Sequence, residues 1–162
     1  MAIHNGDTLP QGTLMTMKPE GPGPISTDEV FKGKKVVLFS VPGAFTPTCS
    51  KKHLPGYLEK YAEFKQKGVD TIACLAVNDA FVMDAWSKAQ GADGKVLMLS
   101  DGNGEFTKKL GLEMDASKYG MGTRGKRFSA IVEDGVVKEL NVEAPGEFKV
   151  SSADATVCQL RP

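Results

Sequence analysis

Apolar runs and helically spaced apolar residues alternate along the chain. Three short runs dominated by apolar residues cover 34–41, 71–77 and 95–100, and glycine, proline or polar residues bound each of them. Such runs are typical of strands that are buried on both faces of a sheet. After the first run the apolar residues fall at a helical spacing instead, at Leu54, Tyr57, Leu58, Tyr61 and Phe64. The pattern therefore predicts strands that alternate with helices.

The first predicted helix has recognisable ends. Thr46 and Pro47 stand in the order of an N-cap and a first helical residue, which predicts a helix start shortly after the first apolar run. Pro55 lies inside the helical pattern and predicts a kink, because proline lacks the N–H that a helix interior uses. Gly68 predicts the end of the helix.

The rest of the chain carries further turn and cap signals. Asp134 and Gly135 separate two apolar segments and form the strongest short hairpin signal in the sequence. Residues 1–33 are rich in glycine, proline and polar residues, which predicts turns and short strands at the edge of the domain. Helices are predicted from Asn78 or Asp79 past Trp86, over 105–112 with Gly111 closing the helix, and from 151–154 onward.

This order of elements predicts an α/β fold with a mixed central sheet flanked by helices. The 162 residues contain no internal repeat and fit one domain over 1–162. Reactive groups on such sheets lie beyond the carboxyl ends of the strands. The segment PGAFTPTC, at 42–49, directly follows the first predicted strand and occupies a place of that kind.

Composition and charge narrow the function. The chain has 20 basic and 20 acidic residues, so its charge gives no reason to expect nucleic acid or an anionic membrane as a partner. No apolar run is long enough to span a membrane, and MAIHNGDTLP lacks the pattern of a secretory signal. Three cysteines, an odd number without a CxxC pair, argue against a disulfide framework. We therefore expect a reducing, cytoplasmic location.

Cys49 is the main candidate for chemistry. If Thr46 is the N-cap, Cys49 is the third helical residue, near unpaired backbone N–H groups and the positive end of the helix dipole. Such surroundings favour the thiolate, which is the reactive form. The alternative is a small core residue after a turn, which is the commonest role of a cysteine. The strand end, the constrained loop and the helix start together favour a reactive thiol.

Thiolate formation alone would not make a fast enzyme. A free thiol is a few per cent ionised at neutral pH, so full ionisation gains some tens-fold in rate, or less than about 3 kcal/mol of barrier. A second group must bind the other reactant and stabilise its leaving group.

Four segments together span almost the whole chain. They are PGAFTPTCSKKHLPGY at 42–57, VNDAFVMDAW at 77–86, LSDGNGEFTKKLGLEMD at 99–115 and RGKRFSAIVEDGVVKELNVE at 124–143. On these segments the chain resembles the peroxiredoxins, and within them the type II, peroxiredoxin-five-like subgroup. The resemblance implies a thioredoxin-like fold and a thiol peroxidase that reduces H2O2 and alkyl hydroperoxides, without a metal or an organic cofactor.

The resemblance also implies roles for four residues. Cys49 matches the peroxidatic cysteine, which attacks the peroxide and becomes a sulfenic acid. Thr46 matches a threonine whose hydroxyl contacts the peroxide and the thiolate. Pro42 matches a proline that shields the site from water, and Arg127 matches an arginine that polarises the peroxide and favours the thiolate.

Other residues are secondary candidates for substrate binding. Gly43 and Phe45 belong to the same motif as the cysteine, and Arg124 is an alternative to the family arginine. His53 lies four residues after the cysteine and could share its helix face, although a surface or subunit-contact histidine is the favoured interpretation over a base. Phe45 and Trp86 could belong to the core or to a dimer face, and the resemblance suggests a homodimer.

The reductant is open at the level of sequence. The subgroup's animal form has a resolving cysteine after its counterpart of NVE, but residues 144–152 contain none here. Cys74 lies in a predicted strand, and we expect it to be a buried packing residue. Cys158 could be exposed or buried. Either cysteine is a possible resolving cysteine. The stretches PGAFTPTCSKKHLPGY and GTRGKRF resemble most the plant and bacterial forms of the subgroup, several of which work through glutaredoxin and glutathione. The resemblance therefore implies that glutathione or glutaredoxin reduces Cys49 from outside, with thioredoxin or an internal disulfide as alternatives.

Three rival functions make different demands on the sequence. A thioredoxin-like reductase would use CxxC, but Lys52 stands three residues after Cys49. A Cys–His hydrolase would need a positioned histidine, and only His4 and His53 exist, without a familiar signature. A redox relay or a holdase that binds partner proteins is compatible with the same sequence.

Overall fold

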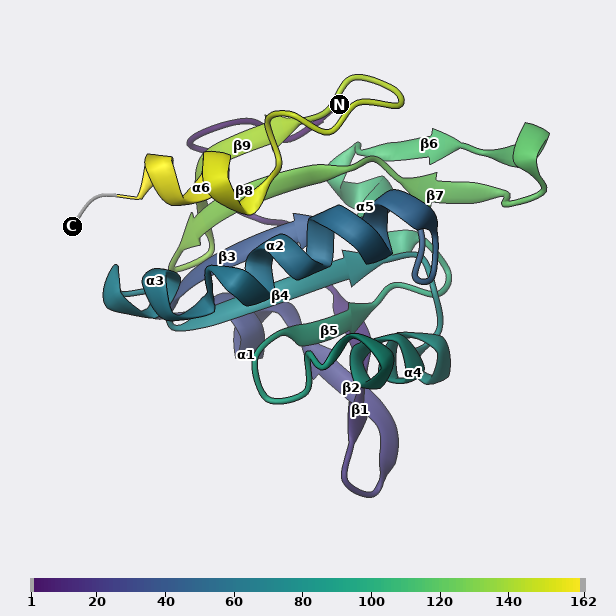
Figure 1. Ribbon diagram of the computed structural model, residues 1–162, viewed down its shortest axis with the longest axis horizontal. Coiled ribbons are helices and arrows are strands. Elements are labelled where there is room, and N and C mark those ends of the chain that lie inside the picture. The colour runs from purple at the N-terminus through teal and green to yellow at the C-terminus, as the bar shows by residue number, and fades with distance from the viewer. Residues whose placement is uncertain (1, 161–162) are drawn as a thin grey trace.

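A mixed seven-stranded sheet forms the centre of the computed structural model, which describes residues 2–160 (Figure 1). The three central strands run parallel to one another, and each outer pairing is antiparallel. From one edge to the other the strands are β2 (Gly21–Ser26), β1 (Thr13–Lys18), β5 (Leu97–Ser100), β4 (Thr71–Ala76), β3 (Lys35–Ser40), β8 (Phe128–Glu133) and β9 (Val136–Val142).

Helices cover both faces of this sheet, which confirms the predicted fold class (Figure 1). One face carries η1 (Cys49–His53), α2 (Leu54–Glu59), α3 (Tyr61–Gln66), α4 (Ala80–Gln90) and α6 (Ala153–Gln159), and the other carries α1 (Thr27–Phe31) and α5 (Glu105–Leu110). Within residues 2–160, none of the helices has the length and apolar character needed to cross a lipid bilayer.

The apolar runs are explained by two cores, one on each face of the sheet. In β3, Val37 and Phe39 belong to the core beneath α2 and α4, whereas Val36 and Leu38 belong to the core beneath α1 and α5. Successive strand side chains point to opposite faces, so a strand between two helical layers needs apolar residues at every position.

Most predicted elements form where their signals lie. Asp134 and Gly135 have φ values of 49° and 77°, as the hairpin turn between β8 and β9 requires. Asp79 caps α4 and Ser152 caps α6, each through its side-chain oxygen. Gly111 ends α5 in the left-handed conformation.

The first helix differs from its prediction in three ways. Thr46 precedes the helix as expected, but its hydroxyl donates to a loop carbonyl and does not cap a helical N–H. The expected kink at Pro55 takes the form of a π-helical turn, in which the Leu54 N–H donates to the Cys49 carbonyl five residues earlier. The remaining segment is divided into α2 and α3. A wide turn directly before a proline accommodates the missing N–H.

Two features at the ends of the sheet were not predicted in detail. The N-terminal region forms β1 and β2 at one edge, as expected, but also the short helix α1. A separate two-stranded sheet, β6 (Glu113–Asp115) with β7 (Thr123–Gly125), encloses the 3-10 turn η2 (Ser117–Tyr119) and lies beside the end of the central sheet (Figure 1).

Candidate active site

The loop between β3 and η1 holds Cys49 at the carboxyl ends of the central strands. The Ala44 N–H donates to Asn78 Oδ1 at 2.9 Å, which ties this loop to the one that follows β4. Phe45 has φ 64°, a left-handed conformation that a residue with a side chain rarely adopts. The Cys49 side chain is fully buried at the end of this restrained approach.

Arg127, directly before β8, brings its guanidinium to the sulfur. Its Nη2–H donates to Cys49 Sγ at 3.1 Å, and its Nη1–H donates to His53 Nδ1 at 2.8 Å. The guanidinium carbon also lies 5.9 Å from the centre of the Phe148 ring. A guanidinium is permanently charged, so this contact stabilises negative charge on the sulfur.

His53 is buried, which corrects the expectation of a surface or subunit-contact histidine. Its Nε2 lies 3.0 Å from the Ser151 carbonyl oxygen, and its ring packs against Phe39 and Phe148. Burial, and then the charge of Arg127, lower the pKa of His53 from 6.5 to about 3, although the Ser151 carbonyl acts in the opposite direction. His53 is therefore neutral, with Nδ1 accepting from Arg127 and Nε2–H donating to Ser151.

Glu143 holds the loop that lies behind His53. Its Oε2 accepts from the Lys149 N–H at 2.7 Å, the Ser151 N–H at 2.8 Å and the Ser151 hydroxyl at 2.7 Å. Burial acts to raise the pKa of Glu143, but the hydrogen bonds from Ser151 and from the Lys149 and Val150 amides outweigh it and lower the pKa. The charged carboxylate thus fixes the Ser151 carbonyl that His53 contacts.

Arg124 links the loop before Cys49 to the β6–β7 hairpin. Its Nη1–H donates to the Pro42 carbonyl at 3.3 Å and its Nε–H to the Met121 carbonyl at 2.9 Å. A Cβ on Gly43 would lie 3.0 Å from Arg124 Nη1, so glycine allows this close approach. The Thr46 hydroxyl donates to the Gly43 carbonyl at 2.7 Å. Arg124 therefore contacts the loop, and Arg127 is the arginine that reaches the sulfur.

The other two cysteines lie in different surroundings. Cys74, in β4, belongs to the same buried cluster as Cys49, and burial raises its pKa well above the usual range. Cys158, in α6, is exposed. Trp86 is also buried, and its Nε1–H donates to Ser50 Oγ at 3.0 Å. Sequence left open whether Trp86 lies in the core or on a dimer face, and the structure places it in the core.

Sequence reasoning missed Glu143, Ser151, Tyr57 and Phe148 as neighbours of the site. The Tyr57 hydroxyl donates to the same Ser151 carbonyl at 2.8 Å. The contacts of His53 and Tyr57 with Ser151 join residues that lie more than 90 positions apart in the chain. Short-range sequence patterns therefore could not predict them. The helical spacing of His53 from Cys49 was the one available signal, since it placed both side chains on one helix face.

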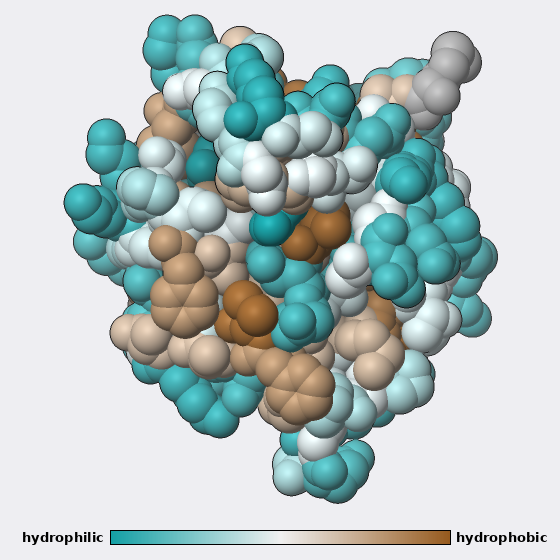
Figure 2. Space-filling view, turned by 90° about the vertical axis from the view of Figure 1, so that its right-hand side faces the viewer, coloured by the Kyte–Doolittle hydropathy of each residue, from teal (hydrophilic) through white to brown (hydrophobic). Residues whose placement is uncertain are grey.

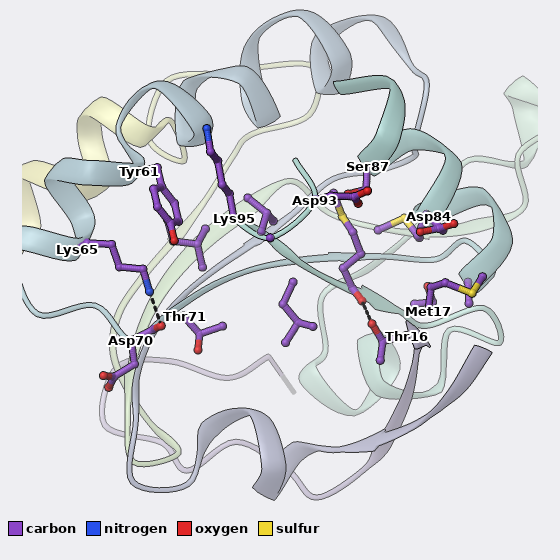
Figure 3. Close-up of a pocket in the computed structure, with 18 residues that line it drawn as sticks. Thr16, Met17, Tyr61, Lys65, Asp70, Thr71, Asp84, Ser87, Asp93 and Lys95 are labelled. Atoms are coloured by element: carbon purple, nitrogen blue, oxygen red, sulfur yellow. Dashed lines mark hydrogen bonds between the residues drawn. The ribbon is translucent and has the colours of Figure 1, made fainter. Parts of the chain in front are cut away.

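A groove of about 700 Å³ opens beside Arg127. Pro42 and Thr48 line it near the cysteine, and the β6–β7 hairpin and residues 143–148 form its other walls. A second cavity, of about 370 Å³, lies between the helices α3 and α4 and the strands β1 and β5, and none of the predicted site residues lines it (Figure 3). Within residues 2–160, no group of three His, Cys, Asp or Glu side chains could hold a metal ion.

Known proteins resemble this chain over nearly its full length. Residues 4–157 match the family described as Redoxin. The chain is 51% identical to Peroxiredoxin-2E, chloroplastic, of Arabidopsis thaliana, over 94% of this chain and 67% of that protein. It is 49% identical to Peroxiredoxin-2B of the same plant, over 92% of this chain and 93% of that protein.

A solved structure agrees with both the fold and the family. Reduced Prx3 from Vibrio vulnificus, in complex with H2O2, is 53% identical to this chain and superposes with a TM-score of 0.95, covering 98% of this chain and 99% of the other. The thioredoxin-like fold expected from sequence is thereby confirmed. With its relatives among the plant type II proteins, the chain belongs to the peroxiredoxins, in the type II or peroxiredoxin-five-like subgroup, and is a thiol-dependent peroxidase.

Proposed function

We propose that Cys49 is the nucleophile of this peroxidase and that it reduces H2O2 and alkyl hydroperoxides. The observation that carries the proposal is the Arg127 N–H donated to Cys49 Sγ at 3.1 Å. The thiolate sulfur attacks the terminal peroxide oxygen, and the O–O bond breaks as the S–O bond forms. Cys49 is oxidised to the sulfenic acid, and the leaving oxygen takes a proton and departs as water or an alcohol.

Arg127, Thr46 and Pro42 complete the proposed catalytic site. Negative charge moves from sulfur to the leaving oxygen, and a guanidinium that already contacts the sulfur can stabilise it throughout. The Thr46 hydroxyl gives its hydrogen to the Gly43 carbonyl, so its oxygen remains an acceptor for a peroxide O–H. Pro42 lies in the groove wall and restricts water, and Phe45 belongs to the same loop.

An external thiol is the proposed reductant. Cys74 is buried and its raised pKa keeps it a thiol, which disfavours it as a resolving nucleophile. Glutathione or glutaredoxin would attack the Cys49 sulfenic acid, releasing water and forming a mixed disulfide, and a second thiol would then release Cys49. Thioredoxin is the alternative reductant, and a disulfide to exposed Cys158 is the alternative route.

We also infer a homodimer built from single-domain chains in a reducing, cytoplasmic compartment. The dimer is supported by one face of the molecule, on which apolar side chains, aromatic rings among them, gather (Figure 2). Phe45 and Phe81 are 56% and 65% exposed, unusually high for large apolar residues. A redox relay or a holdase would use the same site or the same surface. Measuring client binding and peroxide turnover at equal protein concentration distinguishes these roles from that of a peroxidase.

Intact mass after sub-stoichiometric H2O2 tests the proposed function. The reduced protein should gain one oxygen, and the Cys49→Ser variant should gain none. A protein with Cys74→Ala and Cys158→Ser should behave as wild type and should turn over with glutathione and glutaredoxin.

Two results would contradict parts of this proposal. Loss of two hydrogens in the wild type would show a disulfide, and peptide mapping would then name Cys74 or Cys158 as the resolver. Equal oxygen uptake by wild type and Cys49→Ser would remove Cys49 as the nucleophile.

A further inference from the structure

The cavity between α3, α4, β1 and β5 combines a buried apolar lining with charged residues around it (Figure 3). Its volume is about 370 Å³, and sites for small ligands usually enclose roughly 300 to 1,000 Å³. None of its lining residues belongs to the site around Cys49, so the cavity is open to a separate role. The buried apolar side chains that line it are Ile72, Met83, Val96 and Met98.

One buried hydroxyl that lines the cavity has no hydrogen-bond partner. Ser100, at the end of β5, is 2% exposed, and among the described residues no donor or acceptor contacts its Oγ. The nearby Thr16 hydroxyl, by contrast, donates to the Met98 carbonyl at 2.9 Å (Figure 3). A buried polar group without a partner is costly. The Ser100 hydroxyl is therefore available to a polar group of a ligand.

Two lysines converge on one aromatic ring at the α3 end of the cavity. The ammonium groups of Lys65 and Lys95 lie 5.6 Å and 5.9 Å from the centre of the Tyr61 ring, and neither lysine takes part in a salt bridge within residues 2–160. Lys65 donates to the Asp70 backbone carbonyl at 2.6 Å, which is neutral and leaves its charge in place. The Asp70 carboxylate points away from the cavity in Figure 3 and accepts from the Lys35 N–H at 2.8 Å. This end of the cavity is therefore positive.

The α4 end of the cavity is negative. Asp93 accepts from the Ser87 hydroxyl at 2.8 Å, but this donor is neutral, and Asp93 has no salt bridge to any residue that the structure describes. Asp84 pairs with Lys88 at 2.7 Å, so those two charges balance. One negative charge, that of Asp93, remains.

The unpaired charges are kept apart although they lie close together in the sequence. Asp93 and Lys95 are two residues apart, yet their side chains point to opposite ends of the cavity (Figure 3). Asp93 contacts Ser87 of α4, whereas Lys95 lies over Tyr61 of α3. Opposite charges at the two ends of a cavity match a ligand that carries a negative group at one end and a positive group at the other.

We propose that this cavity binds a short peptide of two or three residues as a zwitterion, with its carboxylate at Lys65 and Lys95 and its ammonium group at Asp93. An extended chain spans at most about 3.3 to 3.6 Å per residue, so two or three residues separate the terminal charges by roughly 7 to 11 Å. A peptide group offers both a donor and an acceptor to the Ser100 hydroxyl. An apolar side chain of the peptide covers the apolar lining. This inference is independent of the proposed chemistry of Cys49.

Blocked dipeptides test the two charges separately. Leucyl-alanine, its C-terminal amide and its N-acetyl form are each titrated into the reduced protein and followed by calorimetry. Each blocked form lacks one charge and should bind about tenfold more weakly than the free dipeptide, because hydrogen bonds to charged groups contribute enough for such a factor. K65Q/K95Q should bind the free dipeptide and the amide equally. Asp93→Asn should bind the free dipeptide and the N-acetyl form equally.

Ser100→Ala tests the buried hydroxyl. It should weaken the binding of leucyl-alanine severalfold. It should also raise the melting temperature of the free protein by about 2 to 4 °C, because it removes a buried polar group that has no partner. An unchanged affinity or a lowered melting temperature would contradict the role of Ser100 in the site.

Variants outside the cavity are the controls. K108Q/K138Q and Asp28→Asn change exposed residues that do not line the cavity, and both should keep the preference for the free dipeptide. Oxidation of Cys49 by H2O2 should proceed in every variant, which shows that each one is folded. Failure of that reaction in the wild type would overturn the proposed function and not the peptide site.

Three results would overturn the peptide site and leave the proposed function standing. The first is equal affinity of the wild type for the free and the blocked dipeptides, and the second is no binding of any of them. The third is binding of the N-acetyl form as tight as that of the free dipeptide, which would show a site for anions alone.

Discussion

At the scale of single residues, burial makes His53 a fixed acceptor for Arg127 and not a base for Cys49. A protonated His53 would present an N–H to the Arg127 N–H and would break the contact at 2.8 Å. The neutral ring instead holds one arm of the guanidinium, while the other arm reaches the sulfur. We infer that His53 positions Arg127 without exchanging a proton during turnover.

His53 should make the stability of the fold depend on pH. Folding lowers its pKa from 6.5 to about 3, so the unfolded chain binds the proton more tightly. The linked stability is fully present above pH 6.5 and declines as pH falls toward 3. Between pH 7 and pH 5, wild type should lose about 2 kcal/mol more than His53→Gln in urea unfolding.

His4→Gln is the matched control, because His4 is exposed and lies outside the site. It should follow the wild-type pH dependence. Parallel curves for wild type and His53→Gln would show that His53 is not buried as a neutral ring.

At the scale of elements, the loop after β9 depends on one carboxylate. Glu143 gathers the amides of Lys149 and Ser151, and the Ser151 carbonyl in turn receives His53 and Tyr57. This chain of contacts leads from the end of β9 to the guanidinium of Arg127. The loop is thus part of the support for the active site, although it contributes no group that touches the sulfur.

Glu143→Gln should loosen this loop and slow the reaction with peroxide. An amide cannot accept three hydrogen bonds as a carboxylate does, and hydrogen bonds to charged groups contribute roughly 1.5 to 3 kcal/mol each. Hydrogen exchange at the amides of Lys149 and Ser151 should become faster, and the rate constant with H2O2 should fall severalfold. Acid should act in the same direction, because the lowered pKa of Glu143 makes its contribution present above pH 4.5 and lost as pH falls through the folded value.

Glu147→Gln serves as the control in the same loop. Glu147 is exposed and pairs only with Lys149 at 3.5 Å, so its change should leave exchange and rate near wild type. Unchanged exchange in Glu143→Gln would remove the carboxylate as the support of the loop.

The elements that sequence predicted are those whose signal is local. The run at 34–41 and the Asp134–Gly135 turn encode β3 and the β8–β9 hairpin within a few residues. The strands β6 and β7 have three residues each and form by pairing with one another. Each is too short to show the alternation of apolar and polar residues by which a strand is recognised in a sequence. Cys49 and Arg127 could be assigned by resemblance, but the burial of His53 depends on contacts 74 and 98 positions away.

At the scale of the whole molecule, one face combines the active-site loop with exposed aromatic residues. Phe45 lies in that loop, and Phe81 lies in the first turn of α4. Both the loop and α4 come directly after the carboxyl ends of central strands, so they lie at the same end of the sheet. Figure 2 views the molecule from the side where the loop before η1 and the start of α4 lie in Figure 1, and apolar side chains gather on the face that it shows. A second copy of the chain that covered this face would lie close to the site.

Phe81→Glu should convert a dimer to a monomer without unfolding it. A carboxylate in the first turn of α4 is favourable to the helix, but it is costly at an apolar interface. Light scattering should fall from twice the 17.3 kDa chain mass toward a single chain. Ala89→Glu, exposed in the last turn of the same helix, should remain dimeric. A wild-type mass of one chain would reject the dimer directly.

The composition of β2, at the edge of the central sheet, has a consequence for behaviour at high concentration. In β2, Pro22 pairs with Met17 of β1 and Pro24 pairs with Met15. The two prolines are two positions apart in the strand, so their backbone nitrogens point to the same side of it. Proline is tolerated in an edge strand where its nitrogen faces away from the neighbouring strand. The outward side of β2 therefore lacks two of the donors that an added strand would need. We therefore expect the two prolines to disfavour the joining of sheets from crowded copies along this edge, and so to act against fibrous self-association there.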